Sequence, residues 1–205
     1  MAGTLCPVSD SSQKNLETIK RALSDNYLDL KIASLAFEED FGSGQCKIRV
    51  VTRAAGADTI VEGQGVGLID ALFSGLFRRY ATEYQSLNTI KLTGFLVKAR
   101  LESERGRLGA DAVGEVTLEV QNSAGRPFNF SDASRSIVGS AARSVVAAVE
   151  FFVNSERAFV ALHQAMEAAK ERKRPDLVAQ YTKDLSEVVE STSYADVIEG
   201  IKKKL

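Results

Sequence analysis

The residues with the clearest chemical potential form a short glycine-rich run. In Glu62-Gly63-Gln64-Gly65-Val66-Gly67, every second residue is a glycine. The run lies between a predicted strand and the first turn of a predicted helix. Glycines at such a junction let backbone N–H groups approach an anion, close to the positive end of the helix. The spacing differs from a dinucleotide fingerprint, and no P-loop lysine follows. A purely structural interpretation stays open, in which the glycines only permit a tight turn.

Asp70 follows this run in the first turn of the predicted helix, where the helix dipole stabilises a carboxylate. The same carboxylate can pair with the amino group of a ligand. Backbone N–H groups and one carboxylate are together what a free amino acid requires, because the first bind its α-carboxylate and the second its α-ammonium group. The alternative is that Asp70 simply favours the start of the helix.

The sequence does not supply the other usual catalytic or metal-binding combinations. It contains one histidine, His163, and two cysteines, Cys6 and Cys46, without CxxC or HExxH spacing. We therefore expect no metal, no cofactor and no enzymatic activity. We expect His163 to be a packing residue, and Ser131 with Asp132 to cap the second long helix.

Charge and hydropathy exclude further classes of protein. The chain has 26 Lys and Arg against 27 Asp and Glu, a net charge of −1 and a pI near 6.0. It therefore lacks the concentrated basic surface that nucleic acid or an anionic membrane requires. There is no basic, apolar secretory leader and no apolar stretch of ~18 residues. We expect a cytoplasmic protein.

The elements that must position these residues follow from the periodicity of the apolar side chains. Alternation predicts strands over residues 28–32, 46–50 and 59–64, and a helical stripe covers residues 68–80. The same order returns with strands near 89–101, 110–121 and 126–131 and a helix near 134–153. A repeat of roughly 65 to 70 residues is an organisational signal in itself. The predicted fold is α+β, with two pseudo-repeated βββα units of antiparallel strands and packed helices.

Helices are predicted on both sides of these units. Residues 11–25 have helical apolar spacing, and residues 155–205 contain no strand pattern. Pro175 suits a helix start, which predicts two antiparallel helices joined near 172–175 and a last short helix over 194–205. The predicted organisation is an N-terminal helical segment (1–26), a domain of two units (27–153, units 27–85 and 89–153) and an all-helical tail (154–205).

Four motifs in this order resemble the C-terminal regulatory, or dimerisation, domain of α-isopropylmalate synthase and citramalate synthase. The run EGQGVGLIDALFSGLFRRY resembles the family pattern GxGNGPVDAxxxAL: Gly65, Gly67, Asp70, Ala71 and Leu72 match, whereas Val66 replaces an asparagine and Leu68 a proline. LTGFLVKARL resembles LxDYxVHAxT, with Leu92, Val97 and Ala99 kept and Phe95 in place of tyrosine. Residues 109–112 resemble GTDA, and SDASRSIVGSAARSVVAAVEFF resembles the last helix of the family.

The resemblance implies a homodimer that binds leucine or a related branched-chain amino acid between the units, near the dimer interface. Carried over residue by residue, it implies ligand contacts at Gly65, Val66, Gly67, Asp70, Phe95, Ala99 and Ala112. In the family the ligand inhibits a remote (β/α)₈ catalytic domain with a metal-binding HxH motif, and this sequence contains neither. The expectation is a freestanding regulatory domain with an added helical tail, not a synthase.

A second hypothesis stays open beside amino-acid binding. Val66 and Leu68 change the loop that would hold the ligand, and Phe95 removes a hydroxyl group from the expected pocket. These differences favour a ligand-free structural or assembly protein. Such a protein would pair with a separately encoded synthase or another partner, through the same surface or through the helices of residues 155–205.

Overall fold

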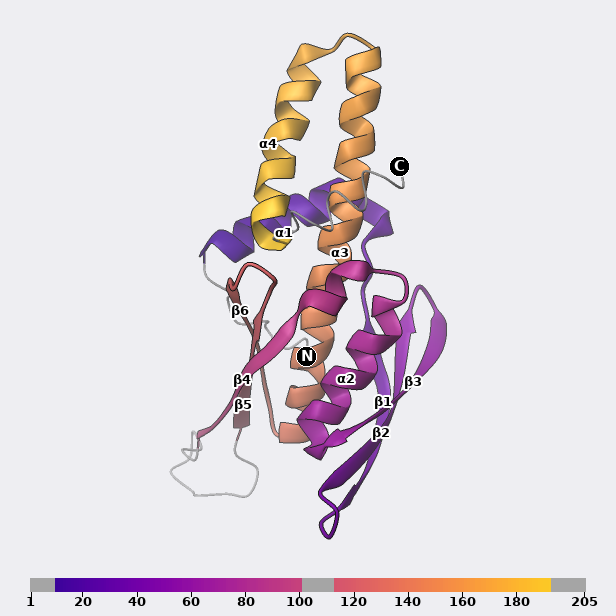
Figure 1. Ribbon diagram of the computed structural model, residues 1–205, viewed down its shortest axis with the longest axis vertical. Helices are drawn as coiled ribbons and strands as arrows, with labels where there is room; N and C mark the ends of the chain where they lie inside the picture. Colours follow the sequence, from indigo (N-terminus) through magenta and orange to yellow (C-terminus); the bar gives the residue numbers. More distant parts are fainter. Residues whose placement is uncertain (1–9, 101–112, 193–205) are drawn as a thin grey trace.

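The computed structural model describes residues 10–100 and 113–192, and it confirms the α+β fold with two βββα units followed by helices (Figure 1). The first unit consists of β1 (Lys31–Asp40), β2 (Gln45–Ala54), β3 (Ala57–Val66) and α2 (Gly67–Ala81). The second consists of β4 (Lys91–Arg100), β5 (Val113–Gln121), β6 (Pro127–Ser134) and α3 (Ile137–Glu171). The remaining elements are α1 (Asp10–Leu23), the 3₁₀ turns η1 (Ser24–Asn26) and η2 (Gln85–Thr89), and α4 (Pro175–Thr192).

The two units repeat each other in detail. Each sheet is an antiparallel meander, in the order β1-β2-β3 and β4-β5-β6. The register of each first strand shifts at the same place, between Ile32 and Ser34 in β1 and between Leu92 and Gly94 in β4. Irregularities of this kind bend and twist an edge strand. Both β1 and β4 are edge strands, so the pseudo-duplication extends to the strand irregularity.

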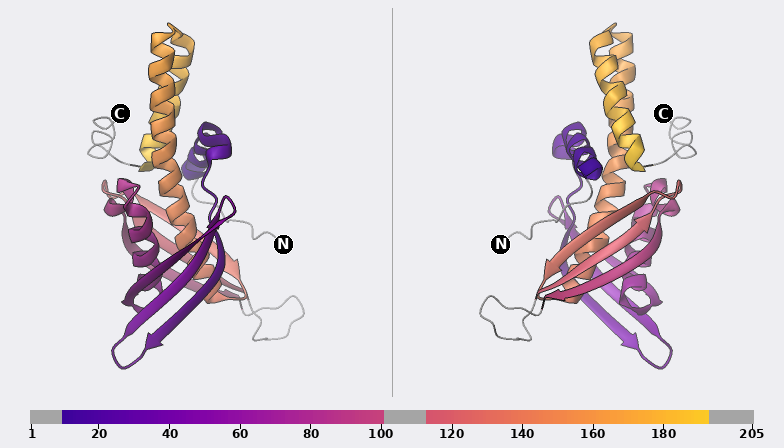
Figure 2. Two further views of the ribbon diagram at one scale, coloured as in Figure 1. Left: turned by 90° about the vertical axis from the view of Figure 1, so that its right-hand side faces the viewer. Right: turned by 90° about the vertical axis from the view of Figure 1, so that its left-hand side faces the viewer.

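Helices α2 and α3 lie side by side between the two sheets (Figures 1 and 2). Helix α2 packs on β3 and β2, and α3 packs on β6 and β5. The central strands supply the buried inner surfaces, which are Cys46, Ile48 and Val50 in β2 and Val116, Leu118 and Val120 in β5. Alternation of apolar and polar residues in these strands therefore encodes one helix-facing side in each sheet.

Glycines bring α2 unusually close to β3. A Cβ atom on Gly63 would lie 2.3 Å from the carbonyl oxygen of Ala71 and 2.9 Å from Cα of Gly75. Side chains at these positions would push the helix away from the strand. Part of the glycine-rich run is thus required by the close packing of α2 on β3, which is a different reason from the tight turn that the structural interpretation of the sequence expected.

Several element boundaries differ from the sequence prediction, because the strands of the first unit and β6 extend beyond the predicted ranges and the largest differences are in β1 and α3. Strand β1 begins at Lys31, so residues 28–30 precede the strand that alternation placed over 28–32. Helix α3 continues to Glu171 through the predicted break after residue 153, because Asn154 and Ser155 are buried within the helix and find hydrogen-bond partners. The range 27–153 therefore ends inside a helix.

Helix α3 is the described helix that is long and apolar enough to cross a bilayer by length and composition. Within the fold, 67% of the relevant window is buried, as in the core helix of a soluble protein. Its C-terminal half forms the predicted antiparallel hairpin with α4, which projects beyond the sheets (Figure 1). Helix α1 crosses this hairpin and is joined to α4 by Arg21–Asp184 (2.8 Å) and Thr18–Glu187 (2.8 Å). The last short helix, predicted over 194–205, lies outside the described residues.

Polar side chains of α3 hold the segment that leads into β1. The side-chain amide of Asn154 accepts from the backbone N–H of Leu28 (2.8 Å) and donates to its carbonyl oxygen (2.9 Å). One turn earlier, the carboxylate of Glu150 accepts from the backbone N–H of Leu30. A side chain thus provides the partners that a neighbouring strand would otherwise give to this backbone.

Burial changes the proton affinity of the groups around this contact. Burial raises the pKa of Glu150 to about 7, against the opposing effect of the hydrogen bond from Leu30. Burial, with the charge of Glu150 as a second cause, raises the pKa of Tyr27 to about 12. Glu150 is therefore a carboxyl group whose protonation changes near neutral pH.

We predict that Glu150→Gln flattens the pH dependence of stability. The folded-state pKa of Glu150 lies above its ordinary value of 4.5, so the stability that it contributes is complete below pH 4.5 and is lost as the pH rises through about 7. The shift corresponds to at most ~3 kcal/mol. Urea unfolding of the wild type should therefore show falling stability from pH 5 to pH 8. The variant should lose most of this slope, because glutamine keeps an acceptor for Leu30 without a charge.

Glu167→Gln is the matched control on the same helix. Glu167 is exposed, and its hydrogen bond from Lys170 lowers its pKa, so it stays ionised between pH 5 and pH 8. The control should keep the wild-type slope. Equal slopes for the wild type and Glu150→Gln would contradict the assignment to Glu150.

Candidate functional site

The turn from β3 into α2 is tighter than the sequence predicted, because residues 62–66 of the glycine-rich run belong to β3 and pair with β2, and only Gly67 lies in α2. Strand β3 ends at Val66, and α2 begins at Gly67, whose φ of +79° lies in the left-handed region that favours glycine. The side chain of Val66 is 73% exposed. The turn therefore presents an apolar side chain and the first N–H groups of α2 at one end of the molecule.

Asp70 closes this turn from within the chain. Its Oδ2 accepts a hydrogen bond from the backbone N–H of Val66, the residue before the helix, at 2.8 Å. A carboxylate that reaches back from the first turn to this N–H group is a known way of stabilising a helix start. The hydrogen bond from Val66 thus supports the interpretation that Asp70 stabilises the start of α2.

A second carboxylate lies near the same helix end. Glu39 of β1 is half-buried, and a Cβ atom on Gly67 would lie 3.9 Å from its Oε1. Burial and the negative charge of Glu39 raise the pKa of the Cys46 thiol, which faces the same side of the sheet. The positive end of α2 is therefore surrounded by acidic groups of this chain.

The remaining residues of the expected ligand site belong to the second unit. Phe95 and Ala99 lie on β4, opposite Leu118 and Gly114 of β5. Ala112 lies outside the described residues. The structure thus brings Gly65 and Val66 at the end of β3 next to Gly67 and Asp70 at the start of α2. It places Phe95 and Ala99 on β4, an edge strand of the other sheet.

The first strand of each sheet, β1 and β4, carries apolar side chains on the helix-facing side that no helix covers completely. Phe37 of β1 lies opposite the buried Ile48, yet it is 46% exposed. In β4, Phe95 lies opposite the buried Leu118, and Val97 lies opposite the buried Val116, yet they are 38% and 39% exposed. The cause is that each helix packs on the other two strands of its sheet. We call these two equivalent surfaces the open strand faces.

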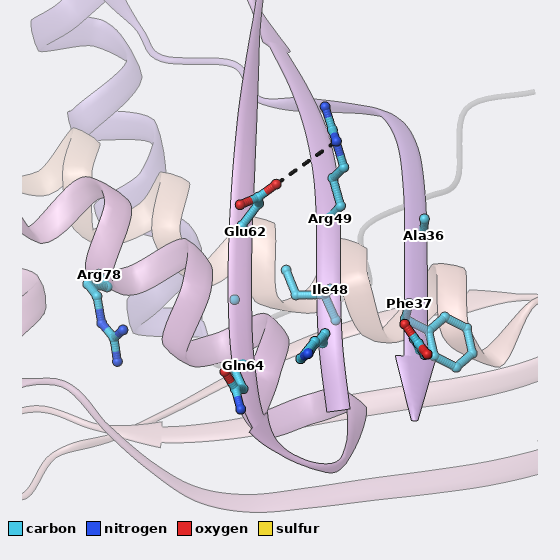
Figure 3. A pocket seen from close by; sticks show the side chains of 10 residues that line it. Ala36, Phe37, Ile48, Arg49, Glu62, Gln64 and Arg78 are labelled. Atoms are coloured by element: carbon cyan, nitrogen blue, oxygen red, sulfur yellow. Dashed lines mark ion pairs between the residues drawn. The ribbon is translucent and has the colours of Figure 1, made fainter. Parts of the chain in front are cut away.

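The outer side of the first sheet has a shallow hollow of about 680 Å³ (Figure 3). Charged side chains dominate it, with Arg49 and Glu62 at 4.0 Å on neighbouring strands and Arg78 contributed by α2. Because these charges are exposed and of both signs, the ion pair adds little to stability. The turn residues Gly65 and Asp70 are not part of this wall.

The start of α3 is capped differently from the prediction. Ser136, and not Ser131 with Asp132, is the N-cap: its Oγ accepts from the backbone N–H of Gly139 at 3.0 Å. Asp132 instead pairs with Arg143 at 2.7 Å. The reason is that β6 continues to Ser134, which leaves Asp132 inside a strand.

The potential metal ligands do not gather in the part of the chain that is described. Within residues 10–100 and 113–192, no three His, Cys, Asp or Glu side chains lie close enough together to hold a metal ion. His163 is half-buried and stacks on Phe159 with ring centroids 6.2 Å apart. This is the packing role that the sequence suggested.

Sequence reasoning missed the polar residues inside α3. Glu150, Asn154 and Glu156 interrupt the apolar run VVAAVEFFVNSERAF, and Glu156 accepts from the buried backbone N–H of Ser86 at 3.1 Å. The signal in the sequence was the presence of these polar side chains within an otherwise apolar helix. Buried polar groups require partners, so they indicate contacts with backbone outside the helix.

Comparison with protein-family models and with curated proteins finds no match for this chain. The likeness to the regulatory domain of α-isopropylmalate synthase thus depends on the four sequence motifs alone and stays a prediction.

We predict that Asp70→Ala destabilises the protein by about 1 kcal/mol, the typical cost of removing a helix-capping side chain. The variant leaves the N–H group of Val66 without its acceptor. Asp70→Asn is the control, because its side-chain oxygen can still accept that hydrogen bond. Urea unfolding should rank the wild type and Asp70→Asn together, above Asp70→Ala. Equal stability of all three would show that the contact does not hold the turn.

Proposed function

We propose that this protein is a non-catalytic dimerisation and regulatory module of the kind found in α-isopropylmalate synthase, and that it works in the cytoplasm. The open strand faces carry this proposal. Phe37, Phe95 and Val97 belong to the helix-facing sides of their sheets, where a soluble protein buries such residues. A second copy of the chain would cover them with its own apolar surface, and the protein would be a homodimer.

The duplication within the chain favours this arrangement. The open strand faces are equivalent in the two units, and α2 and α3 both begin at the same end of the molecule (Figure 1). Val66 and Ile137, at or beside these helix starts, are also strongly exposed. Exposed apolar residues that form a contiguous surface mark interaction sites, so the exposed residues at this end and on the open strand faces are candidates for the dimer contact.

We further propose that the dimer binds leucine or a related branched-chain amino acid at the turn from β3 into α2. The first N–H groups of α2 would bind the α-carboxylate, and Asp70 would bind the ammonium group through the oxygen that Val66 does not use. Val66 and Phe95 would contact the side chain. Binding would be transmitted to a separately encoded synthase that lacks its own regulatory domain.

A specific observation favours the ligand-free candidate, an assembly protein for such a synthase or another partner. Asp70 already bonds to Val66, and Glu39 lies near the same helix start. Two internal carboxylates reduce the attraction of this helix end for the carboxylate of a ligand. Both candidate functions include the dimer. They differ in whether the dimer binds an amino acid.

We predict that Val97→Glu breaks the dimer, whereas Leu96→Glu leaves it intact. The two residues are neighbours on β4 with similar exposure (39% and 45%), but Val97 lies on the helix-facing side and Leu96 on the outer side. Burying an unpaired carboxylate costs on the order of 3 kcal/mol, which weakens association by about 100-fold. Sedimentation velocity over a range of concentrations measures both variants. A monomeric wild type at every concentration, or equal weakening by both variants, would refute the proposed interface.

We predict that leucine binds to the wild-type protein and binds more weakly to Asp70→Ala. Isothermal titration with leucine, isoleucine and valine measures the affinities, and D-leucine is the control for stereospecific binding. Asp70→Asn keeps the hydrogen bond from Val66 and lacks the charge. Its leucine affinity therefore shows whether weaker binding in Asp70→Ala reflects the lost carboxylate or the lost turn contact. No heat and no thermal shift with any of the three at millimolar concentration would remove the ligand and leave the assembly protein.

A further inference from the structure

A separate hollow of about 440 Å³ lies where the end of α1, the segment between α2 and η2, and the middle of α3 meet. Its volume is in the range of small-molecule sites. Leu23, Val160 and Ala161 form its apolar wall, and Tyr84, Glu156 and Arg157 are among its polar residues. The hollow shares no residue with the turn from β3 into α2.

Glu156 is a charged group that is only 8% exposed. Its Oε2 accepts from the backbone N–H of Ser86 at 3.1 Å, and its Oε1 makes no hydrogen bond or ion pair with the residues in the described ranges 10–100 and 113–192. The buried hydroxyl of Ser86 also lacks a partner in this part of the chain. A buried carboxylate with one oxygen held and one unused is an incomplete polar site, because buried charges normally have partners.

Arg157 supplies the opposite charge beside it. Its guanidinium group makes no hydrogen bond or ion pair with the residues that the structure describes, although the side chain is half-buried. Burial raises the pKa of Tyr84, which the charge of Arg157 lowers and the charge of Glu156 raises. Both charges thus act on one phenol group that lines the hollow. The third charge there, Glu83, is paired with Arg79 at 2.7 Å.

We propose that this hollow binds a small zwitterion with an aliphatic side chain, such as a free α-amino acid. Glu156 Oε1 binds its ammonium group, Arg157 binds its carboxylate, and the aliphatic part packs on Leu23, Val160 and Ala161. Because three segments of the chain meet here, the ligand joins α1 and the α2–η2 segment to α3. This site is independent of the proposed function and of the turn that contains Asp70.

The test uses the full-length chain and three matched probes: L-norvaline, n-butylamine, which lacks its carboxylate, and pentanoate, which lacks its ammonium group. Isothermal titration should show norvaline as the strongest ligand, with each single-charge analogue weaker by about tenfold or more, since a charged hydrogen bond is lost in each. Equal binding of norvaline and either analogue would overturn the two-charge assignment.

Two variants assign the charges. Glu156→Gln keeps an acceptor for the N–H group of Ser86 and should weaken norvaline and butylamine but not pentanoate. Arg157→Gln should weaken norvaline and pentanoate but not butylamine. Glu167→Gln and Arg172→Gln, at exposed positions of α3 and its C-terminal end, are the controls and should bind as the wild type does. Unchanged norvaline affinity in both Glu156→Gln and Arg157→Gln would overturn the proposal.

A third variant and a mapping experiment complete the test. Ala161→Phe fills the hollow without changing its charge and should abolish norvaline binding at residues 84–86 and 156–161, while thermal unfolding reports whether each variant is folded. Amide NMR shifts induced by norvaline should map to residues 84–86 and 156–161. Shifts confined to residues 65–70 would overturn this site while supporting the turn as the ligand site. Shifts at 84–86 and 156–161 without any at 65–70 would support this site, whatever the outcome of the leucine experiment.

Discussion

The arrangement of the two units depends on the hydrogen bonds that α3 makes with backbone outside its own unit. Asn154 binds both backbone groups of Leu28, Glu150 binds Leu30, and Glu156 binds Ser86. Residues 150 and 154 share one face of the helix, and residue 156 lies about 200° around it from 154. Opposite sides of α3 therefore hold the segments that precede β1 and β4, and one helix sets the position of both sheets.

This constraint explains why the chain leaves its edge strands partly uncovered. Helix α3 packs on β5 and β6 and also holds the backbone before β1, while α2 is drawn onto β3 by the close approach of Gly63 and Gly75. With both helices committed in this way, neither extends fully over β1 or β4. The open strand faces follow from the packing, and they are the physical reason for the proposed dimer, because exposed apolar surface is costly in water.

The seven residues that the resemblance implies as ligand contacts do not all lie together in the fold. Four of the seven residues that the resemblance implies lie where β3 meets α2, Phe95 and Ala99 lie on β4, and Ala112 is outside the described ranges. The sequence predicted the helix start beside Gly67 correctly, because a left-handed glycine and a helix start are local features, but it did not predict that Gly65 and Val66 still pair within β3. The contact of Asp70 with Val66 is local as well. The burial of Glu156 is not local, and its position in an apolar helix indicates only that it needs a partner, not which one.

The sequence by itself determined the elements, their order and their duplication, because the side-chain period of a strand or helix is a property of neighbouring residues. It also determined the inner side of each sheet. Tertiary structure decided how far α3 extends, where β1 begins, and which strands remain uncovered. These features depend on contacts between residues more than 100 positions apart, such as Leu28 with Asn154. Local periodicity shows that a surface must be buried, but only the assembled fold shows what covers it and what is left open.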